Sequence, residues 1–232
     1  MNYFLTSNPL LATEQKLNPS NKFVDNLKEC ISNQDKVLFI CSNPNSYQLT
    51  DKFSEEIRIC FFNSGFEFGK FTVLDNRTVI EKKLLIREAN TIILAGGHVP
   101  TQNTFFNEID LKSELKNTNK VIIGISAGSM NCADEVYAQP DLEGESVSTN
   151  YKRFLKGLGI TKSHILPHYN LIKDSYLDGK KLFEEITYLD SFGKEFIAIN
   201  DGSYLYGNGT QEKIYGESYI ISDGNVKKLL SS

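Results

Sequence analysis

The chain has 232 residues, of which 40% are hydrophobic, which is enough for one substantial core, and we expect a single domain over residues 1–232. The net charge is −4 and lysine is interleaved with acidic residues, which excludes the basic patches typical of nucleic-acid binding. The apolar runs are too short to span a membrane, and the N-terminus lacks the pattern of a secretory signal, so we expect a cytoplasmic protein.

Short apolar segments alternate with amphipathic ones through residue 135. We expect strands at residues 3–6, 36–41, 71–74, 91–95 and 121–123, and helices at residues 20–32, 50–63, 78–88 and 102–116. Ser20 is the predicted cap of the first helix. This alternation predicts a three-layer α/β fold with a mostly parallel, doubly wound sheet, whose active site lies at the carboxyl ends of the strands.

The pattern changes after residue 135. Residues 134–151 are polar and rich in turn-forming residues, so we expect a long loop there. A short strand is predicted at residues 164–168 and a helix at residues 177–186. From residue 195 onward, short apolar segments are separated by glycine-containing turns, which predicts a C-terminal antiparallel β-meander.

The cysteines do not indicate a disulfide framework or a zinc site. Cys30, Cys41, Cys60 and Cys132 are scattered without paired spacing, and we interpret them as reduced core residues. Two histidines at positions 164 and 168 have the spacing of a metal-ligand pair, but no third ligand of suitable spacing accompanies them. We therefore expect neither a metal nor an organic cofactor.

A Gly-x-Ser-x-Gly motif at residues 124–128 directly follows the β-branched strand pattern at residues 121–123. A segment that can form a helix comes next. This is the layout of a nucleophile elbow, in which a strand delivers a serine, here Ser126, onto a sharp turn and the next helix directs free N–H groups at the site. The N–H group of Ala127 is the corresponding candidate for stabilising an oxyanion.

A serine nucleophile needs a general base, and the chain contains three histidines. His168 directly follows an apolar strand and is the best candidate. His164 alternates with apolar residues at the start of that strand, so we interpret it as a packing residue. His98 follows a Gly-Gly pair at another strand end, where it could line a substrate pocket.

The Gly-Gly pair at residues 96–97 allows backbone N–H groups to approach a ligand closely, and Gly97 is the second candidate oxyanion donor. An ordinary strand-to-helix turn is the alternative interpretation.

Two aspartates are candidates for the acid of a triad. Asp201 lies at a turn after an apolar strand, although Asp-Gly is also a common hairpin signal. Asp141, in the long loop after the elbow, is its rival, and the sequence leaves this choice open.

Three segments in this order resemble the serine peptidases of family S51, which includes dipeptidase E and cyanophycinase. They are the Gly-Gly pair followed by Asn103, the elbow at residues 124–128, and the Leu-Pro-His-Tyr segment at residues 166–169. The resemblance spans about residues 39–202. It implies a fold like that of class I glutamine amidotransferases, with Ser126 as nucleophile and His168 as base. It also places Asp201 as the acid, while Asp141 matches a second aspartate of the family.

Two differences from dipeptidase E concern the substrate. Residues 98–102 enlarge the loop between the glycines and Asn103. The arginine-containing segment that follows the histidine in dipeptidase E is replaced by residues 170–176, where Lys173 supplies charge but not a bidentate fork. We therefore expect His98, Asn103 and Lys173 to contact substrate, and the case for aspartyl-dipeptide specificity is weakened.

Together these observations predict a serine hydrolase that cleaves a short peptide or small amide through Ser126, His168 and Asp201 and an acyl-enzyme. One alternative is a non-enzymatic relative that binds a small molecule in the same pocket, which the altered loop and the missing arginine motivate. Another is an esterase with the same triad. We expect no nucleic-acid or membrane partner, and the oligomeric state stays open, with a homodimer among the options.

Overall fold

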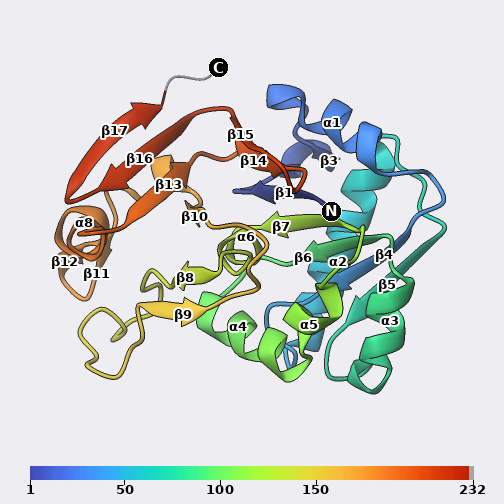
Figure 1. The fold of residues 1–232 in the computed structure, drawn as a ribbon, viewed down its shortest axis with the longest axis horizontal. Coiled ribbons are helices and arrows are strands. Elements are labelled where there is room, and N and C mark those ends of the chain that lie inside the picture. Colours follow the sequence, from blue (N-terminus) through green and yellow to red (C-terminus); the bar gives the residue numbers. More distant parts are fainter. Residues whose placement is uncertain (230–232) are drawn as a thin grey trace.

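The computed structural model describes residues 1–229 and is built around a seven-stranded sheet in the order β15-β14-β1-β7-β6-β4-β5 (Figure 1). Five strands of this sheet run parallel. They are β1 (Asn2–Thr6), β7 (Val121–Ile125), β6 (Thr91–Leu94), β4 (Lys36–Ile40) and β5 (Lys70–Leu74). The antiparallel strands β14 (Tyr204–Gly207) and β15 (Glu212–Tyr215) extend the sheet beyond β1. The predicted α/β fold with a mostly parallel sheet is therefore confirmed.

Helices cover both faces of this sheet. Helices α1 (Phe23–Cys30) and α2 (Tyr47–Asn63) belong to connections that run from β1 toward β5, whereas α3 (Lys82–Glu88), α4 (Val99–Glu108) and α5 (Leu111–Leu115) belong to connections that run back toward β7. Because parallel crossovers are right-handed, the two sets lie on opposite faces. The connection that follows β4 leads outward to β5, whereas the connection that follows β6 leads back to β7. The topological switch point of the sheet therefore lies between β4 and β6.

Several boundaries differ from those predicted. Ser20 does not cap α1, because it lies in a 3₁₀ turn (Ser20–Lys22) and the N-cap position is taken by Lys22 with φ 60°. Residues 78–88 divide into a 3₁₀ turn (Val79–Glu81) and α3. The helix expected at residues 102–116 starts earlier and is two helices, because Asp110 adopts a left-handed conformation with φ 53° between α4 and α5.

A second sheet contains β10 (His164–Leu166), β13 (Glu195–Ile199), β16 (Ser218–Ser222) and β17 (Asn225–Leu229) in that order. The C-terminal strands are antiparallel, as predicted, but they do not form one meander. Strands β14 and β15 join the central sheet, where β14 pairs with the edge that β1 would otherwise expose. Strands β16 and β17 return to pair with β13.

The segment before the second sheet is more structured than predicted. The expected loop at residues 134–151 begins with β8 (Glu135–Tyr137), which pairs with β9 (Phe154–Lys156). The prediction of a helix at residues 177–186 is wrong for the first half of this segment, where β11 (Tyr176–Leu177) and β12 (Lys180–Lys181) form a hairpin. The Asp-Gly turn of this hairpin has positive φ at both residues, and such turns favour tight hairpins. A π-helix (Leu182–Thr187) and α8 (Tyr188–Asp190) follow.

Smaller elements complete the fold. They are the hairpin of β2 (Leu10–Leu11) and β3 (Lys16–Leu17) with its 3₁₀ turn (Ala12–Glu14), and the short helices α6 (Ala127–Met130) and α7 (Tyr169–Ile172). Within residues 1–229, no helix combines the length and the apolar character that crossing a membrane requires.

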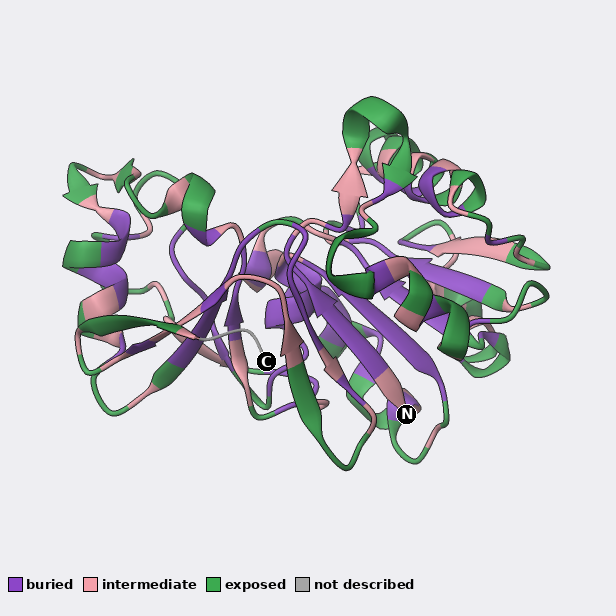
Figure 2. Cartoon of the chain, turned by 90° about the horizontal axis from the view of Figure 1, so that it is seen from above, coloured by how far each residue is buried: buried purple, intermediate pink, exposed green. Residues whose placement is uncertain are grey.

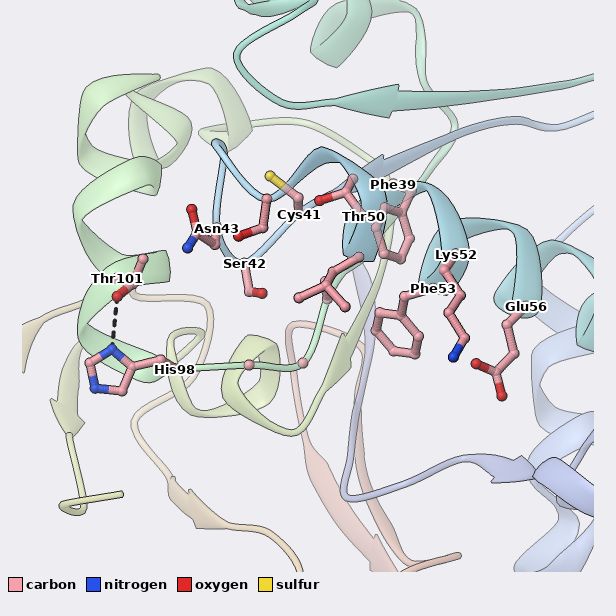
Figure 3. A pocket seen from close by; sticks show the side chains of 15 residues that line it. Phe39, Cys41, Ser42, Asn43, Thr50, Lys52, Phe53, Glu56, His98 and Thr101 are labelled. Atoms are coloured by element: carbon pink, nitrogen blue, oxygen red, sulfur yellow. Dashed lines mark hydrogen bonds between the residues drawn. The ribbon is translucent and has the colours of Figure 1, made fainter. Parts of the chain in front are cut away.

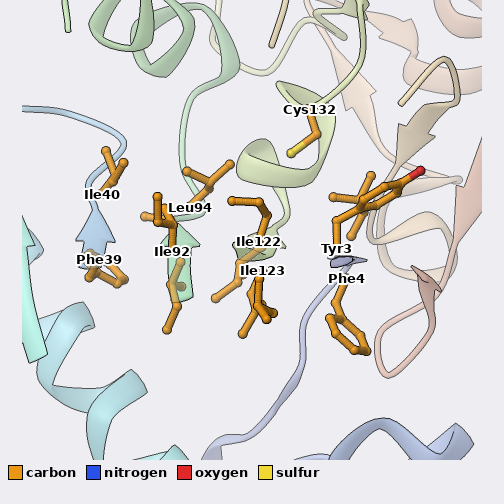
Figure 4. Packing of buried hydrophobic residues seen from close by; sticks show 14 of the residues in the cluster. Tyr3, Phe4, Phe39, Ile40, Ile92, Leu94, Ile122, Ile123 and Cys132 are labelled. Carbon is orange, nitrogen blue, oxygen red and sulfur yellow. The ribbon is translucent and has the colours of Figure 1, made fainter. Parts of the chain in front are cut away.

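Two hydrophobic cores support these sheets. The larger core surrounds the central sheet, where the buried strands run through the middle of the molecule (Figure 2) and apolar side chains from neighbouring strands pack side by side (Figure 4). Cys41, Cys60 and Cys132 are buried and Cys30 is partly buried, in agreement with their interpretation as core residues. The smaller core lies between the second sheet, the π-helix and α6. Helix α6, which begins directly after Ser126, therefore contributes to the junction between the two sheets.

Candidate active site

Ser126 occupies the turn between β7 and α6. Its backbone has φ 52° and ψ −112°, a conformation that non-glycine residues adopt only where the surrounding structure holds them. The neighbouring strand supplies that support, since the N–H group of Ser126 points at the carbonyl oxygens of Thr6 (3.0 Å) and Ser7 (3.1 Å). The sequence motif thus folds as the expected sharp turn.

The two glycines of the motif are required by close backbone approaches. A Cβ atom on Gly128 would lie 2.3 Å from the carbonyl oxygen of Leu94 in the adjacent strand β6. A Cβ atom on Gly124 would lie 2.7 Å from Cα of Ser129 in α6. Because both obstacles are backbone atoms, any larger residue would push the elbow away from its neighbouring strand or helix.

The parallel pairing of β10 with β13 brings His168 and Asp201 together. Leu166 pairs with Ala198, so both strands end at the same edge of the second sheet. His168 follows two residues after Leu166, and Asp201 follows three residues after Ala198. The turn that carries Asp201 is joined to the central sheet, because the N–H group of Gly202 donates to the carbonyl oxygen of Asn8 (3.0 Å).

The three predicted triad residues form a continuous hydrogen-bonded row. The Nε2 atom of His168 lies 2.9 Å from Oγ of Ser126, and its Nδ1 atom lies 2.7 Å from Oδ1 of Asp201. If the Asp201 carboxylate is ionised, it can only accept, so Nδ1 carries the proton and Nε2 accepts from the serine hydroxyl. His168 also has a left-handed backbone, with φ 59°. The arrangement can transfer a proton from the serine to the imidazole.

Asp201 is suited to remaining ionised. Burial raises the pKa of this carboxyl, but hydrogen bonds from His168, Ser7 and the backbone outweigh burial, so its pKa lies below the usual value for aspartate. The hydrogen bond from Ser7 is short, with 2.6 Å between Oγ of Ser7 and Oδ1 of Asp201.

Ser7 is a residue of this site that our sequence analysis did not identify. Its side chain is fully buried at the carboxyl end of β1. Besides donating to Asp201, its Oγ accepts the backbone N–H of His168 (2.8 Å) and lies 3.3 Å from Nδ1 of His168. A polar residue directly after a buried parallel strand was the available signal, since such strand ends share one edge with the elbow.

The structure does not place Asp141, the alternative candidate for the acid, next to His168. Asp141 is exposed in the loop after β8, and its N–H group donates to Glu145 (2.9 Å). Asn103 is not part of the hydrogen-bonded row either. Its amide group donates to Asn131 (2.9 Å) and to the carbonyl oxygen of Lys156 (3.0 Å), which indicates a structural role. Lys173 is exposed just after α7, and its contact with substrate stays a prediction.

His98 lies at the edge of a cavity, as Figure 3 shows. Both of its ring nitrogens have partners within the protein: Nδ1 lies 2.8 Å from Thr101 and Nε2 lies 2.8 Å from Glu145. The Glu145 carboxylate also accepts N–H groups from the start of its own loop. His98 therefore connects the loop after β6 to the loop after β8.

The candidate oxyanion donors lie beside Ser126. Ala127 is the first residue of α6, and the first N–H groups of a helix have no partner inside it. A Cβ atom placed on Gly96 would lie 3.4 Å from Cβ of Ser126, so the Gly-Gly segment after β6 runs next to the nucleophile. Within residues 1–229, no group of three or more His, Cys, Asp or Glu side chains is arranged to hold a metal ion.

Comparison with known proteins agrees with this fold. The sequence model for peptidase family S51 matches residues 3–215. Two solved structures are similar: a peptidase from an acI-B1 actinobacterium (TM-score 0.66, 19% identity, covering 100% of this chain and 94% of the other) and a putative peptidase E from Listeria monocytogenes EGD-e (TM-score 0.60, 16% identity, covering 99% and 98%). A search of curated protein sequences found no significant match.

An α/β sheet with a serine at a nucleophile elbow and a histidine within hydrogen-bond distance defines the general class of serine hydrolases. The match over residues 3–215 narrows this class, and the chain belongs to peptidase family S51. The expectation of a serine-type peptidase is confirmed at the level of the family.

Proposed function

We propose that Ser126, His168 and Asp201 are the catalytic triad of this peptidase. The observation that carries the proposal is the continuous row from Oγ of Ser126 to Nε2 of His168 (2.9 Å) and from Nδ1 of His168 to Asp201 (2.7 Å). The distances are those at which a general base and its orienting acid act on a serine nucleophile. Asp201 is the acid of the proposal because Asp141 has no contact with His168.

The proposed reaction proceeds through an acyl-enzyme. Oγ of Ser126 attacks the scissile carbonyl carbon while its proton moves to Nε2 of His168, and the N–H groups of Gly97 and Ala127 stabilise the oxyanion. His168 then donates this proton to the leaving amine as the C–N bond breaks. A water molecule, deprotonated by His168, attacks the Ser126 ester and releases the acid product.

The proposed substrate is a dipeptide or another short peptide in the cytoplasm. The loop at residues 138–151 is held beside the site from two directions. Glu145 bonds to His98, and Asp178 in the hairpin turn accepts the N–H groups of Gly144 (2.7 Å) and Ser146 (3.0 Å). A loop fixed in this way favours short chains over folded proteins as substrates.

Labelling with a serine-directed fluorophosphonate tests the proposal. We expect stoichiometric labelling of the wild-type protein, mapped by mass spectrometry to the peptide that contains Ser126, and none in Ser126→Ala. We expect His168→Ala to slow labelling by about 10²-fold or more, because the base no longer activates the hydroxyl. Absence of labelling in a folded wild-type protein would contradict the triad and favour the binding-protein alternative.

A further inference from the structure

A cavity of about 390 Å³ lies between the carboxyl ends of β4 and β6 (Figure 3). This is the topological switch point of the central sheet, the place where doubly wound folds bind their ligands. The volume falls within the range of roughly 300–1,000 Å³ that is typical of small-molecule sites. The cavity does not include any residue of the triad, so its role requires a separate argument.

Phenylalanine and leucine side chains form one wall of the cavity, and uncharged polar residues also line it (Ser42, Asn43, Ser46 and Thr101). The rings of Phe39 and Phe53 meet edge-to-face with 5.7 Å between their centroids, and Leu49 adds an aliphatic wall from α2. Cys41 and Thr50 are buried and contribute a thiol and a hydroxyl. Burial, together with the negative charge of Asp75, raises the pKa of the Cys41 thiol to about 12, so this group is neutral at physiological pH.

The charged residues that line the cavity do not provide a site for a carboxylate. Lys52 and Glu56, four residues apart on α2, give the cavity one charge of each sign, so these two side chains together contribute no net charge. His98 is already hydrogen-bonded through both ring nitrogens. Among the described residues, no arginine lines the cavity, so a bidentate clamp for an acidic side chain is lacking.

The order of groups along the sheet edge relates the cavity to the reaction. His168 and Asp201 lie next to Ser7 at the end of β1, Ser126 follows β7, and the Gly-Gly segment follows β6, with the cavity beyond it. Since His168 donates a proton to the leaving amine, the amine must lie on the β1 side of Ser126. The acyl part of the substrate then extends toward β6 and the cavity. Gly96 lines the cavity and also lies close to Ser126, so the cavity is adjacent to the nucleophile.

We infer that this cavity, which we call the switch-point subsite, receives the side chain of the residue that supplies the scissile carbonyl, and that it selects an uncharged aromatic or long aliphatic side chain. This inference rests on the proposed triad. It adds the class of substrate, since the proposed function alone does not distinguish apolar from charged residues at this position.

The test uses diphenyl phosphonate esters of amino acids, which phosphonylate the catalytic serine and differ only in their side chain. Their second-order rates of inactivation are measured as loss of fluorophosphonate labelling at Ser126. We expect the benzyl compound to react at least about 10-fold faster than the carboxymethyl and the aminobutyl compounds, because apolar pockets discriminate by about 10- to 200-fold for small changes in fit. Equal rates, or a faster carboxymethyl compound, would overturn the inference.

Two variants on α2 link the preference to the cavity. Leu49 lines the cavity with its side chain 70% exposed, so Leu49→Trp can narrow the opening without disturbing the core. We expect this variant to lower the rate ratio of the benzyl to the methyl compound at least about 10-fold. Gln48→Trp, at an exposed neighbouring position outside the cavity, is the matched control and should keep the wild-type ratio.

The outcomes separate the two proposals. If the fluorophosphonate labels Ser126 but the side-chain ratio is the same in wild type, Leu49→Trp and Gln48→Trp, the triad stands and the switch-point subsite is wrong. If the fluorophosphonate does not label Ser126 in the folded wild-type protein, the proposed function is wrong, and the switch-point subsite, which rests on it, is wrong as well.

Discussion

Ser126 and His168 both have positive φ angles, 52° and 59°, and both are held by groups at the end of β1. Such conformations cost on the order of 1–3 kcal/mol each and persist where other contacts determine them. Ser7 provides part of this support, because its hydroxyl contacts the backbone of His168 and the carboxylate of Asp201 at the same time. At the scale of single residues, the site therefore depends on a fourth polar side chain.

Replacing Ser7 with alanine removes this support without adding bulk. We expect Ser7→Ala to slow fluorophosphonate labelling of Ser126 by about 10- to 100-fold, since a hydrogen bond to a charged group contributes about 1.5–3 kcal/mol. Because the role is positioning, the measurement includes the pH profile of labelling, whose shape should change as the Asp201 carboxylate loses a donor.

Ser203→Ala is the matched control for Ser7→Ala. Ser203 is a buried serine near the same turn, with 3% exposure, but among the described residues its side chain forms no hydrogen bond with the proposed triad. An equal loss of labelling in both variants, with an unchanged pH profile in Ser7→Ala, would show that Ser7 contributes only general stability.

The residues of the row could be predicted from the sequence to different degrees. Ser126 was identified because its motif and the preceding strand are local signals, and His168 because it follows an apolar strand. Asp201 could not be separated from Asp141, since only the parallel pairing of β10 with β13 decides which carboxylate reaches the imidazole. The contact of Ser7 with His168 and Asp201 could not be predicted for the same reason, because it depends on how segments far apart in the sequence pack together.

At the scale of elements, the loop at residues 138–151 is held by a carboxylate. Glu145 accepts N–H groups from Asp141 (2.9 Å) and Leu142 (3.0 Å) and bonds to His98 (2.8 Å). Burial raises the pKa of Glu145, but these hydrogen bonds and the nearby His98 outweigh burial, so its pKa is lowered in the folded protein. The ionised form of Glu145 thus stabilises the loop.

This lowered pKa determines how loop stability depends on pH. The contribution of Glu145 is complete above the pKa of glutamate in the unfolded chain, about 4.3, and is lost as the pH falls through the lower pKa of the folded state. We expect Glu145→Gln to increase hydrogen exchange of the amides at residues 139–146 at neutral pH. The difference from wild type should shrink as the pH falls through the lowered pKa of Glu145.

Hydrogen-exchange mass spectrometry, corrected for intrinsic rates, measures this difference between pH 7 and pH 2.5. Glu143→Gln is the control, because Glu143 is exposed in the same loop. Protection that is the same in Glu145→Gln and wild type at neutral pH would contradict the account of the loop.

Local patterns predicted the elements of the central sheet well and those after residue 135 less well. The alternation of apolar strands and amphipathic helices is a signal within each segment. The division of the C-terminal strands between two sheets cannot be seen within any one segment, because it depends on whether β14 pairs with β1 or with its neighbours in sequence. The β11–β12 hairpin was missed although its Asp-Gly turn was a visible signal.

At the scale of the whole molecule, the proposed triad spans the two sheets. Ser126 belongs to the central sheet, whereas His168 and Asp201 follow strands of the second sheet and depend on the smaller core. In that core, Phe196 on β13 is fully buried and stacks on Tyr137 with 4.4 Å between the ring centroids. The geometry of the row should therefore be sensitive to packing under the second sheet.

A pair of phenylalanine substitutions tests this dependence. Phe196→Leu in the smaller core and Phe61→Leu in α2 of the larger core each remove a buried ring, and we expect both to lower the free energy of unfolding by about 1–3 kcal/mol. Only Phe196→Leu should slow fluorophosphonate labelling of Ser126 at a temperature where both variants are folded. Equal labelling rates in the two variants would contradict the link between the second sheet and the row.

The central claim is that Ser126 forms a covalent acyl intermediate under the control of His168. The most direct measurement is acid-quenched mass spectrometry after rapid mixing of the protein with the p-nitrophenyl ester of an N-blocked phenylalanine. We predict an adduct of the acyl mass on the peptide that contains Ser126, formed in a burst with p-nitrophenol, absent in Ser126→Ala and much slower in His168→Ala. Release of p-nitrophenol without an adduct, or an adduct on another residue, would contradict it.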